Sequence, residues 1–186
     1  EVERVKEKRK TAPVKRGVVL AALAMMLGAA ALVGMLLFVN ATTLRGTVSR
    51  SALTTAMPEE LDASAEIWDV YLERGVFKTR GALYRKGIGA VDLRVGLIWQ
   101  PEGGEEEDTV MLLNTQMVQI DRREAQTRGV DDHCGFAAAV KLERLPHPGE
   151  DGQYRAVLID EGKLIDALSL TIRRQGKNWT VERGSR

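Results

Sequence analysis

Residues Gly17 to Val39 form an uninterrupted run of 23 residues without a charged side chain. An α-helix needs about 20 apolar residues to cross the hydrocarbon core of a bilayer. Lipid offers no hydrogen-bond partners, so a spanning backbone must satisfy its own polar groups, as a helix does. A signal peptide is the main alternative, because Val39-Asn40-Ala41 resembles a cleavage site, but signal peptides have apolar stretches of only about 7–15 residues. The run therefore predicts a retained transmembrane helix over residues 17–40.

The charges that flank this run give it an orientation. Residues 1–16 carry seven Lys or Arg and three Glu side chains, a net charge of +4, whereas the nearest basic residues after the run are Arg45 and Arg50. Short segments rich in Lys and Arg stay on the cytoplasmic side of a membrane. The sequence therefore predicts a cytoplasmic segment over residues 1–16, a single pass through the cytoplasmic (inner) membrane and its lipid bilayer, and an extracytoplasmic C-terminal domain.

Small residues recur along one face of the expected helix. At about 3.6 residues per turn, a spacing that alternates between four and three residues returns to the same side. Small faces let membrane helices approach closely enough to pack. Glycine is also frequent in membrane helices generally, so a chance spacing is the alternative. The stripe predicts a packing seam for another membrane helix, formed by Gly17, Ala21, Ala24, Gly28 and Ala31.

The composition of the remaining chain excludes some classes of function. After residue 16 there are 20 basic and 23 acidic side chains, whereas a nucleic-acid-binding domain concentrates positive charge on its folded part. We therefore expect no nucleic-acid partner. Cys134 is the single cysteine, so no intrachain disulfide can form and the domain must depend on a packed core.

The chain beyond the run divides into two stretches. Residues 41–64 are rich in Thr, Ser and Ala, which predicts a stalk or linker. Residues 65–186 show apolar residues at every second position, most clearly from Val91 to Trp99, which predicts strands buried on one face. Strands without intervening helices favour an all-β, antiparallel fold over residues 65–186, a β-sandwich with a barrel as the alternative. The strands are expected near residues 66–73, 77–85, 91–99, 109–120, 135–143, 153–160, 163–173 and 178–184.

One stretch resembles a known family. Residues 150–159 read Glu-Asp-Gly-Gln-Tyr-Arg-Ala-Val-Leu-Ile, which is similar to the Asp-x-Gly-x-Tyr-x-Cys corner of immunoglobulin-like domains. The resemblance implies an Ig-like β-sandwich in which Tyr154 opens strand F and its hydroxyl hydrogen-bonds back across the corner. Ala156 stands where such domains carry a disulfide cysteine. The structural corner implied in this way consists of Asp151, Gly152 and Tyr154.

A second, looser likeness is to β-sandwich modules of bacterial cell-envelope and surface-polysaccharide proteins. It rests on Gly135-Phe136, Leu145-Pro146 and Gly152-Gln153-Tyr154. Those modules are accessory and non-catalytic, so the likeness implies a cell-envelope setting and an accessory role.

Three clusters could carry chemistry, and each has a plainer interpretation. In Asp131-Asp132-His133-Cys134, neighbours on a strand point to opposite faces, so His133 and Cys134 cannot easily form a catalytic pair. The cluster also lacks the repeated Cys/His spacing of a zinc site. Residues 105–108 offer carboxylates for calcium but lack the alternating Asp/Asn loop, which favours a solvated hairpin tip. Residues 87–89 (Gly-Ile-Gly) open a strand and not a helix, unlike a dinucleotide-binding loop. We expect no catalytic residue, no cofactor and no metal.

Together these features predict a non-enzymatic membrane subunit whose outer domain scaffolds a larger cell-envelope complex, with another integral membrane protein as partner through both helix and domain. The alternative is a membrane-tethered binding module for a glycan or peptide, which needs exposed aromatic side chains. Trp68 and Tyr71 lie on opposite faces of the first expected strand, so one of them is the candidate. The arginines on outward positions are expected to pair with acids, with an anionic glycan surface as the alternative.

Overall fold

The computed structural model describes residues 16–86 and 92–184, excluding the side chains of Arg16 and Val18. The predicted cytoplasmic segment, apart from Arg16, lies outside these residues, as do Val91 and the 87–89 stretch. The chain forms two compact units that divide between Phe38 and Val39.

The first unit is built on one helix, α1 (Arg16–Ala41). Its 26 residues give a length of roughly 39 Å at ~1.5 Å per residue. The stretch Val19–Ala41 is long and apolar enough to cross a membrane. Large apolar side chains such as Met25, Leu27 and Leu37 are exposed along it, and a helix that is apolar on all sides needs an apolar environment. The predicted apolar helix and its length are confirmed.

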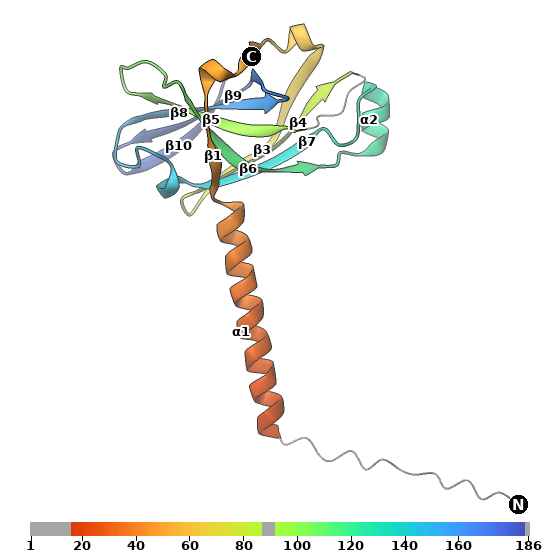
Figure 1. The fold of residues 1–186 in the computed structure, drawn as a ribbon, viewed down its shortest axis with the longest axis vertical. Coiled ribbons are helices and arrows are strands. Elements are labelled where there is room, and N and C mark those ends of the chain that lie inside the picture. Colours follow the sequence, from red (N-terminus) through yellow and green to blue (C-terminus); the bar gives the residue numbers. More distant parts are fainter. Residues whose placement is uncertain (1–15, 87–91, 185–186) are drawn as a thin grey trace, which may run out of the picture. The chain divides into compact units, whose positions relative to one another are not determined.

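The second unit is mostly β (Figure 1). Its strands are β1 (Leu44–Ser49), β2 (Thr54–Ala56), β3 (Ala63–Glu73), β4 (Val76–Arg85), β5 (Arg94–Pro101), β6 (Thr109–Val118), β7 (Gly135–Lys141), β8 (Gly152–Asp160), β9 (Lys163–Gln175) and β10 (Asn178–Arg183). Short helices join some of them: η1 (Arg50–Ala52), η2 (Glu59–Leu61), α2 (Arg122–Arg128) and η3 (Leu142–Arg144).

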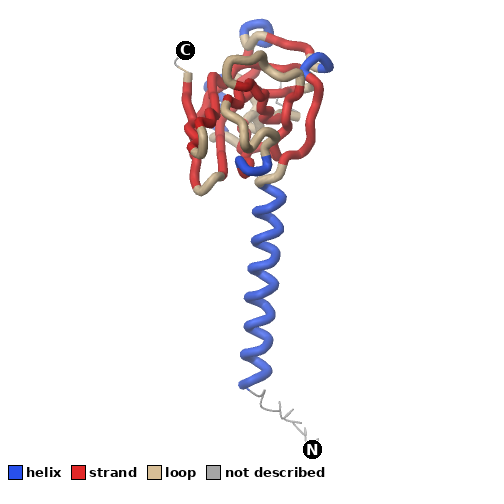
Figure 2. Tube along the Cα trace, turned by 90° about the vertical axis from the view of Figure 1, so that its left-hand side faces the viewer, coloured by secondary structure: helices blue, strands red, loops and turns tan. Residues whose placement is uncertain are grey.

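The strands form one curled sheet in the order β10-β9-β8-β5-β6-β7-β4-β3, with β1 on β6 and β2 on β9. Figure 2 shows the strands curling around a shared interior. β6 connects the two sides of the sheet, because residues 110–112 pair with β5 and residues 114–118 pair with β7. We call β5, β8 and β9 the covered half, and β4, β7 and residues 114–118 of β6 the open half, after the state of their outer faces.

The eight strands predicted from the period of two correspond to β3 to β10. Three features differ from the sequence-based expectation. Residues 41–64 are not a stalk, because β1 and β2 within them pair with β6 and β9. The sheet is mixed and not purely antiparallel, because β2 runs parallel to β9. The long stretch of chain between these two strands permits the parallel pairing, which a short hairpin connection would exclude.

The helix α2 was not expected; Asp121 caps it by accepting hydrogen bonds from the backbone N–H groups of Arg123 and Glu124.

β5 differs from its expected pattern, because it is buried on both faces. Leu97 faces the interior of the curl, and Ile98 faces outward into a second cluster beneath β1 and the segment before β2. Val48 and Leu53 pack onto that cluster from the segment that the sequence pattern assigned to a stalk. The segment therefore forms an outer layer over the covered half.

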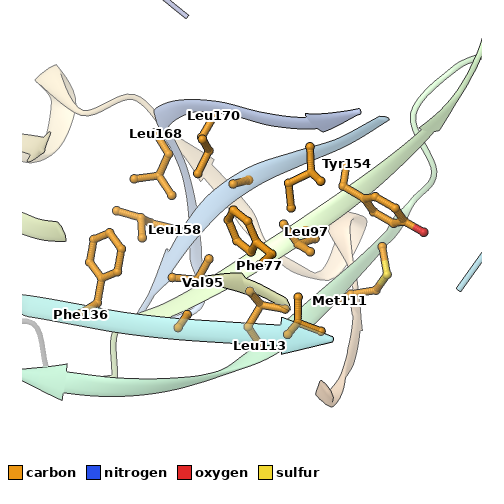
Figure 3. Close-up of a cluster of buried hydrophobic side chains, with 14 of the residues drawn as sticks. Phe77, Val95, Leu97, Met111, Leu113, Phe136, Tyr154, Leu158, Leu168 and Leu170 are labelled. Carbon is orange, nitrogen blue, oxygen red and sulfur yellow. The ribbon is translucent and has the colours of Figure 1, made fainter. Parts of the chain in front are cut away.

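The main core fills the inside of the curl (Figure 3). Its largest side chains include Phe77, Phe136, Trp99 and Tyr154, and all four are almost fully buried. Fully burying one large apolar side chain contributes about 1.5–3 kcal/mol, so this cluster is the main source of stability for a unit without a disulfide. A smaller cluster that includes Cys134 lies beside α2.

Candidate interaction surface

A shallow groove of about 220 Å³ runs along the outer face of the open half. Its floor is β7, where Ala137 and Ala139 are half-buried on the outside while Phe136, Ala138 and Val140 are buried on the inside. Alanine at two successive outward positions leaves a recess between neighbouring strands that carry longer side chains. The groove is therefore apolar at its base.

Two rows of cross-strand neighbours cross the groove. They are Tyr71–Lys78–Ala139–Asn114 and Asp69–Arg80–Ala137–Gln116. Tyr71 is 54% exposed, and the neighbouring Asp69 carboxylate raises the pKa of its hydroxyl. Asp69 also pairs with Arg80 at 3.7 Å. One wall of the groove thus carries an exposed aromatic ring and two cations, and the other carries two amides.

The groove reaches Ala41, in the last turn of α1. Here the β unit supplies partners for backbone carbonyls that a helix end leaves unsatisfied. Arg144 Nη1 donates to the carbonyl oxygen of Val39 at 3.2 Å and to the Thr43 hydroxyl at 2.5 Å. Asn114 Nδ2 donates to the carbonyl oxygen of Asn40 at 2.9 Å. The β unit therefore begins within the last turn of α1 itself.

The predicted helix seam lies entirely on α1, and its members are exposed: Gly17, Ala21, Ala24, Gly28 and Ala31. A Cβ atom added at Gly17 or Gly28 would meet nothing within 4 Å. Their spacing on one regular helix places them on a common side. The seam is thus an open stripe of small residues on an exposed apolar helix.

The predicted corner around Tyr154 makes the hydrogen bond that the resemblance implied. Tyr154 is fully buried, and its hydroxyl donates to the carbonyl oxygen of Pro146. Burial raises the pKa of this hydroxyl above its usual range, so the hydroxyl stays protonated and remains a donor. The Tyr154 ring packs against Trp99, with 4.6 Å between ring centroids.

The other two corner residues position the same loop. A Cβ atom on Gly152 would lie 2.5 Å from both the Gln100 carbonyl oxygen and Trp99 Cη2, so only glycine fits there. The carboxylate of Asp151 accepts a hydrogen bond from the backbone N–H of Gly176 at 2.7 Å. These contacts hold the corner loop in place.

Comparisons with protein-family models, with curated proteins and with solved structures find no match for this chain. Its functional surfaces must therefore be argued from its own residues.

The Asp131–Cys134 cluster does not bring thiol and imidazole together. Cys134 is buried, and burial raises its pKa to about 11, so the nucleophilic thiolate is absent at neutral pH. His133 is exposed on the other side, with Nδ1 2.7 Å from the Asp132 carboxylate. Asp131, Asp132 and His133 place ligand-type atoms within 4.8 Å of one another. Two hydrogen bonds hold this turn, one from Gln119 to the Asp132 carboxylate and one from the His133 backbone N–H to the Asp131 carboxylate. These bonds explain why the three groups lie close together.

The acidic loop at residues 105–108 is not a freely solvated tip. Glu106 pairs with Arg50 at 2.7 Å and with Arg155 at 2.5 Å. Asp108 accepts hydrogen bonds from the hydroxyls of Ser49 and Ser51. The loop therefore attaches the covering segment to β8, and its carboxylates are engaged by arginine and hydroxyl groups.

The groove was missed by sequence reasoning. The signal was present, because Ala137 and Ala139 alternate with the larger Phe136 and Val140. Alternation alone identifies the outward positions, but the recess depends on which strands lie beside β7. That information is not local in the sequence.

Proposed function

We propose that this protein is a non-catalytic, single-pass membrane subunit whose extracytoplasmic β domain helps to hold together a larger complex of the cell envelope. Another integral membrane protein would contact it twice, through the seam on α1 and through the alanine-floored groove. Two weak contacts on one chain raise the effective concentration of each, so the assembly can be firm although each surface is small.

One observation carries this proposal: the apolar groove on the open half extends to Ala41, where the apolar helix ends. Ala41 is the last residue of the apolar stretch Val19–Ala41, so the groove includes the point where the chain leaves the predicted membrane span. The orientation, with residues 1–16 in the cytoplasm, follows from the charge count and belongs to the proposal.

The order of strands supports an Ig-like interpretation of the domain. If β3, β4, β5, β7, β8 and β9 are taken as strands A, B, C, E, F and G, then A pairs with B, B with E, C with F and F with G, as in an Ig sandwich. The buried Trp99 on β5 and the Tyr154 hydrogen bond point the same way. The parallel β2 and the continuous β6 are departures from that pattern.

Filling the groove tests the outer contact. Ala139→Glu should place a bulky side chain in the recess, and Lys78 opposite it would pair with the new carboxylate. Purification of the full chain from native membranes should then recover less of a stoichiometric membrane partner. Thr180→Glu, at an exposed position on β10, is the matched control. Equal recovery for both variants would remove the groove from the interface.

Blocking the seam tests the inner contact. Gly28→Leu should reduce partner recovery, because a large side chain keeps helices apart. Gly34→Leu is the control, since six residues at ~3.6 per turn place it about 120° around the helix. If the two variants behave alike, the small-residue stripe is incidental.

The exposed ring of Tyr71 beside Lys78 supports a second candidate function, a tethered module that binds an anionic glycan. Binding of the full chain to purified envelope polysaccharide, weakened by Tyr71→Ala, would favour it. Absence of binding together with recovery of a protein partner would favour the subunit.

A further inference from the structure

A polar hollow of about 260 Å³ in the β unit is lined by Asn40, Thr43, Leu44, Arg45 and Asn114. We propose that this polar hollow binds the phosphate headgroup of an anionic phospholipid in the leaflet where α1 ends. The inference rests on the proposed membrane-spanning role of α1.

The position of the hollow follows from chain connectivity. Asn40 is the first polar residue after the apolar run, and it lines the hollow. If the run spans the bilayer, Asn40 lies at the membrane surface for any angle between the two units. The groups around Asn40 then lie at the depth of lipid headgroups.

The backbone of β1 directs Arg45 to this place. Leu44 pairs with Leu113 and Gly46 pairs with Leu112, so Arg45 is the extra residue of a β-bulge. Bulges turn a side chain away from its regular direction. Among the described residues, the Arg45 side chain has no hydrogen bond or ion pair, although it lines the hollow. A guanidinium group offers paired N–H donors that match two phosphate oxygens.

The other polar side chains that line the hollow, Asn40, Thr43 and Asn114, all carry hydrogen-bond donors. Asn114 uses one amide hydrogen on the Asn40 carbonyl oxygen and retains a second, and the Asn40 amide adds two more. Arg144 lies behind Thr43 and forms no ion pair with a described carboxylate. No carboxylate from the described part of the chain lines the hollow. This chemistry suits an anion held at a membrane surface.

The test measures binding of phosphatidylglycerol and of phosphatidylcholine to the full chain in mild detergent by native mass spectrometry. We expect a preference for phosphatidylglycerol, which Arg45→Gln weakens about fivefold, in line with about 1 kcal/mol per arginine. Arg45→Lys should retain most of the affinity. Arg123→Gln is the matched control, because Arg123 is an exposed arginine on α2 that also lacks an ion pair among described residues.

Three outcomes would overturn the headgroup site: equal binding of the two lipids, no effect of Arg45→Gln, or displacement of the lipid by millimolar inorganic phosphate. The last result would indicate a free-phosphate site. Alkaline extraction of membranes checks the premise separately, since a spanning helix keeps the chain in the pellet. Partner recovery with Arg45→Gln should be unchanged, so failure of this site and failure of the subunit proposal give different results.

Discussion

The two halves of the sheet differ in what lies on their outer faces. On the covered half, outward residues such as Ile98 and Val157, together with Val110 on the adjoining part of β6, are buried beneath Val48 and Leu53. On the open half, the outward residues that line the groove are small or polar and remain accessible, whereas Ala82 and Tyr84, farther along β4, are buried in the cluster beside α2. The segment with Val48 and Leu53 therefore adds an outer layer on the covered half, and the groove on the open half has no such layer.

This difference shows how a protein can leave one sheet face free without exposing a large apolar surface. Large apolar patches on a soluble surface mark interaction sites or aggregation hazards. Ala137 and Ala139 leave a narrow apolar floor, and Lys78 and Arg80 border it with charge. On the covered half, large apolar residues face outward because a chain segment shields them. Four substitutions test this contrast, from the largest expected effect to the smallest.

The largest effect is expected beneath the cover. Ile98→Ala should lower the free energy of unfolding of the β unit by about 3 kcal/mol, because a buried Ile side chain loses its contacts and leaves a cavity. Urea unfolding followed by tryptophan fluorescence measures this, since all three tryptophans, Trp68, Trp99 and Trp179, lie in the β unit. Lys78→Ala on the open half should change stability by less than about 0.5 kcal/mol. Similar losses for the two variants would mean that the halves do not differ.

A small-to-large change should also distinguish the halves. A Cβ atom at Gly96 on β5 would lie 2.7 Å from Val110 Cγ1 and 3.2 Å from Val157 Cγ2. Gly96→Ala should therefore cost about 2 kcal/mol through overpacking beneath the cover. Ala137→Ser adds a single atom on the open half and should be tolerated within about 0.5 kcal/mol. If Gly96→Ala left the free energy of unfolding unchanged, the outer layer would have to move away easily.

The attachment of the covering segment (residues 44–56) to the sheet should depend on pH. The Arg155 guanidinium beside Glu106 holds the pKa of that carboxyl below its usual value of 4.5. A carboxyl with a lowered folded-state pKa contributes its full stabilisation above the unfolded value and loses it as the pH falls through the folded value. Glu106→Gln should therefore cost about 1 kcal/mol at pH 7.

Hydrogen exchange across residues 44–56, measured from pH 7 to pH 3 and corrected for intrinsic rates, reports this attachment. The difference between the natural chain and Glu106→Gln should shrink below about pH 4.5. A difference that stays constant from pH 7 to pH 3 would assign the effect to packing and not to the ion pairs.

The contrast between the halves also separates what the sequence could predict from what it could not. Strands with a regular alternation, such as β7, were predicted because burial on one face leaves a period of two. The covering segment was misjudged because residues 41–64 contain few large apolar residues, of which Val48 and Leu53 pack onto the outer cluster. The continuous apolar stretch from Leu97 to Trp99 is the local signal that β5 is buried on both faces.

The candidate surfaces divide in the same way. The helix seam and the Tyr154 corner could be read from spacing and from a short motif, because each depends on residues close together in the chain. The groove and the polar hollow could not, since they combine residues near Ala41 with others near Tyr71 and Asn114. Sequence alone gives no measure of such long-range neighbours without knowledge of the strand order.

The smallest effect on stability is expected for Arg80, on the rim of the groove. Its ion pair with Asp69 spans 3.7 Å between side chains that are 53% and 37% exposed, and exposed pairs contribute about 0–1 kcal/mol. Arg80→Gln should therefore change the unfolding free energy by less than about 0.5 kcal/mol, at low and at high salt. A loss above 1 kcal/mol would mean that the open half depends on its surface charges for folding.

Because the substitution leaves the fold intact, its effect on partner recovery can be read directly. A reduced recovery with Arg80→Gln, at unchanged stability, would place the rim of the groove in the interface. Unchanged recovery together with a loss for Ala139→Glu would confine the contact to the alanine floor. The two variants together therefore separate a charged contact from an apolar one on the half of the sheet that the chain leaves uncovered.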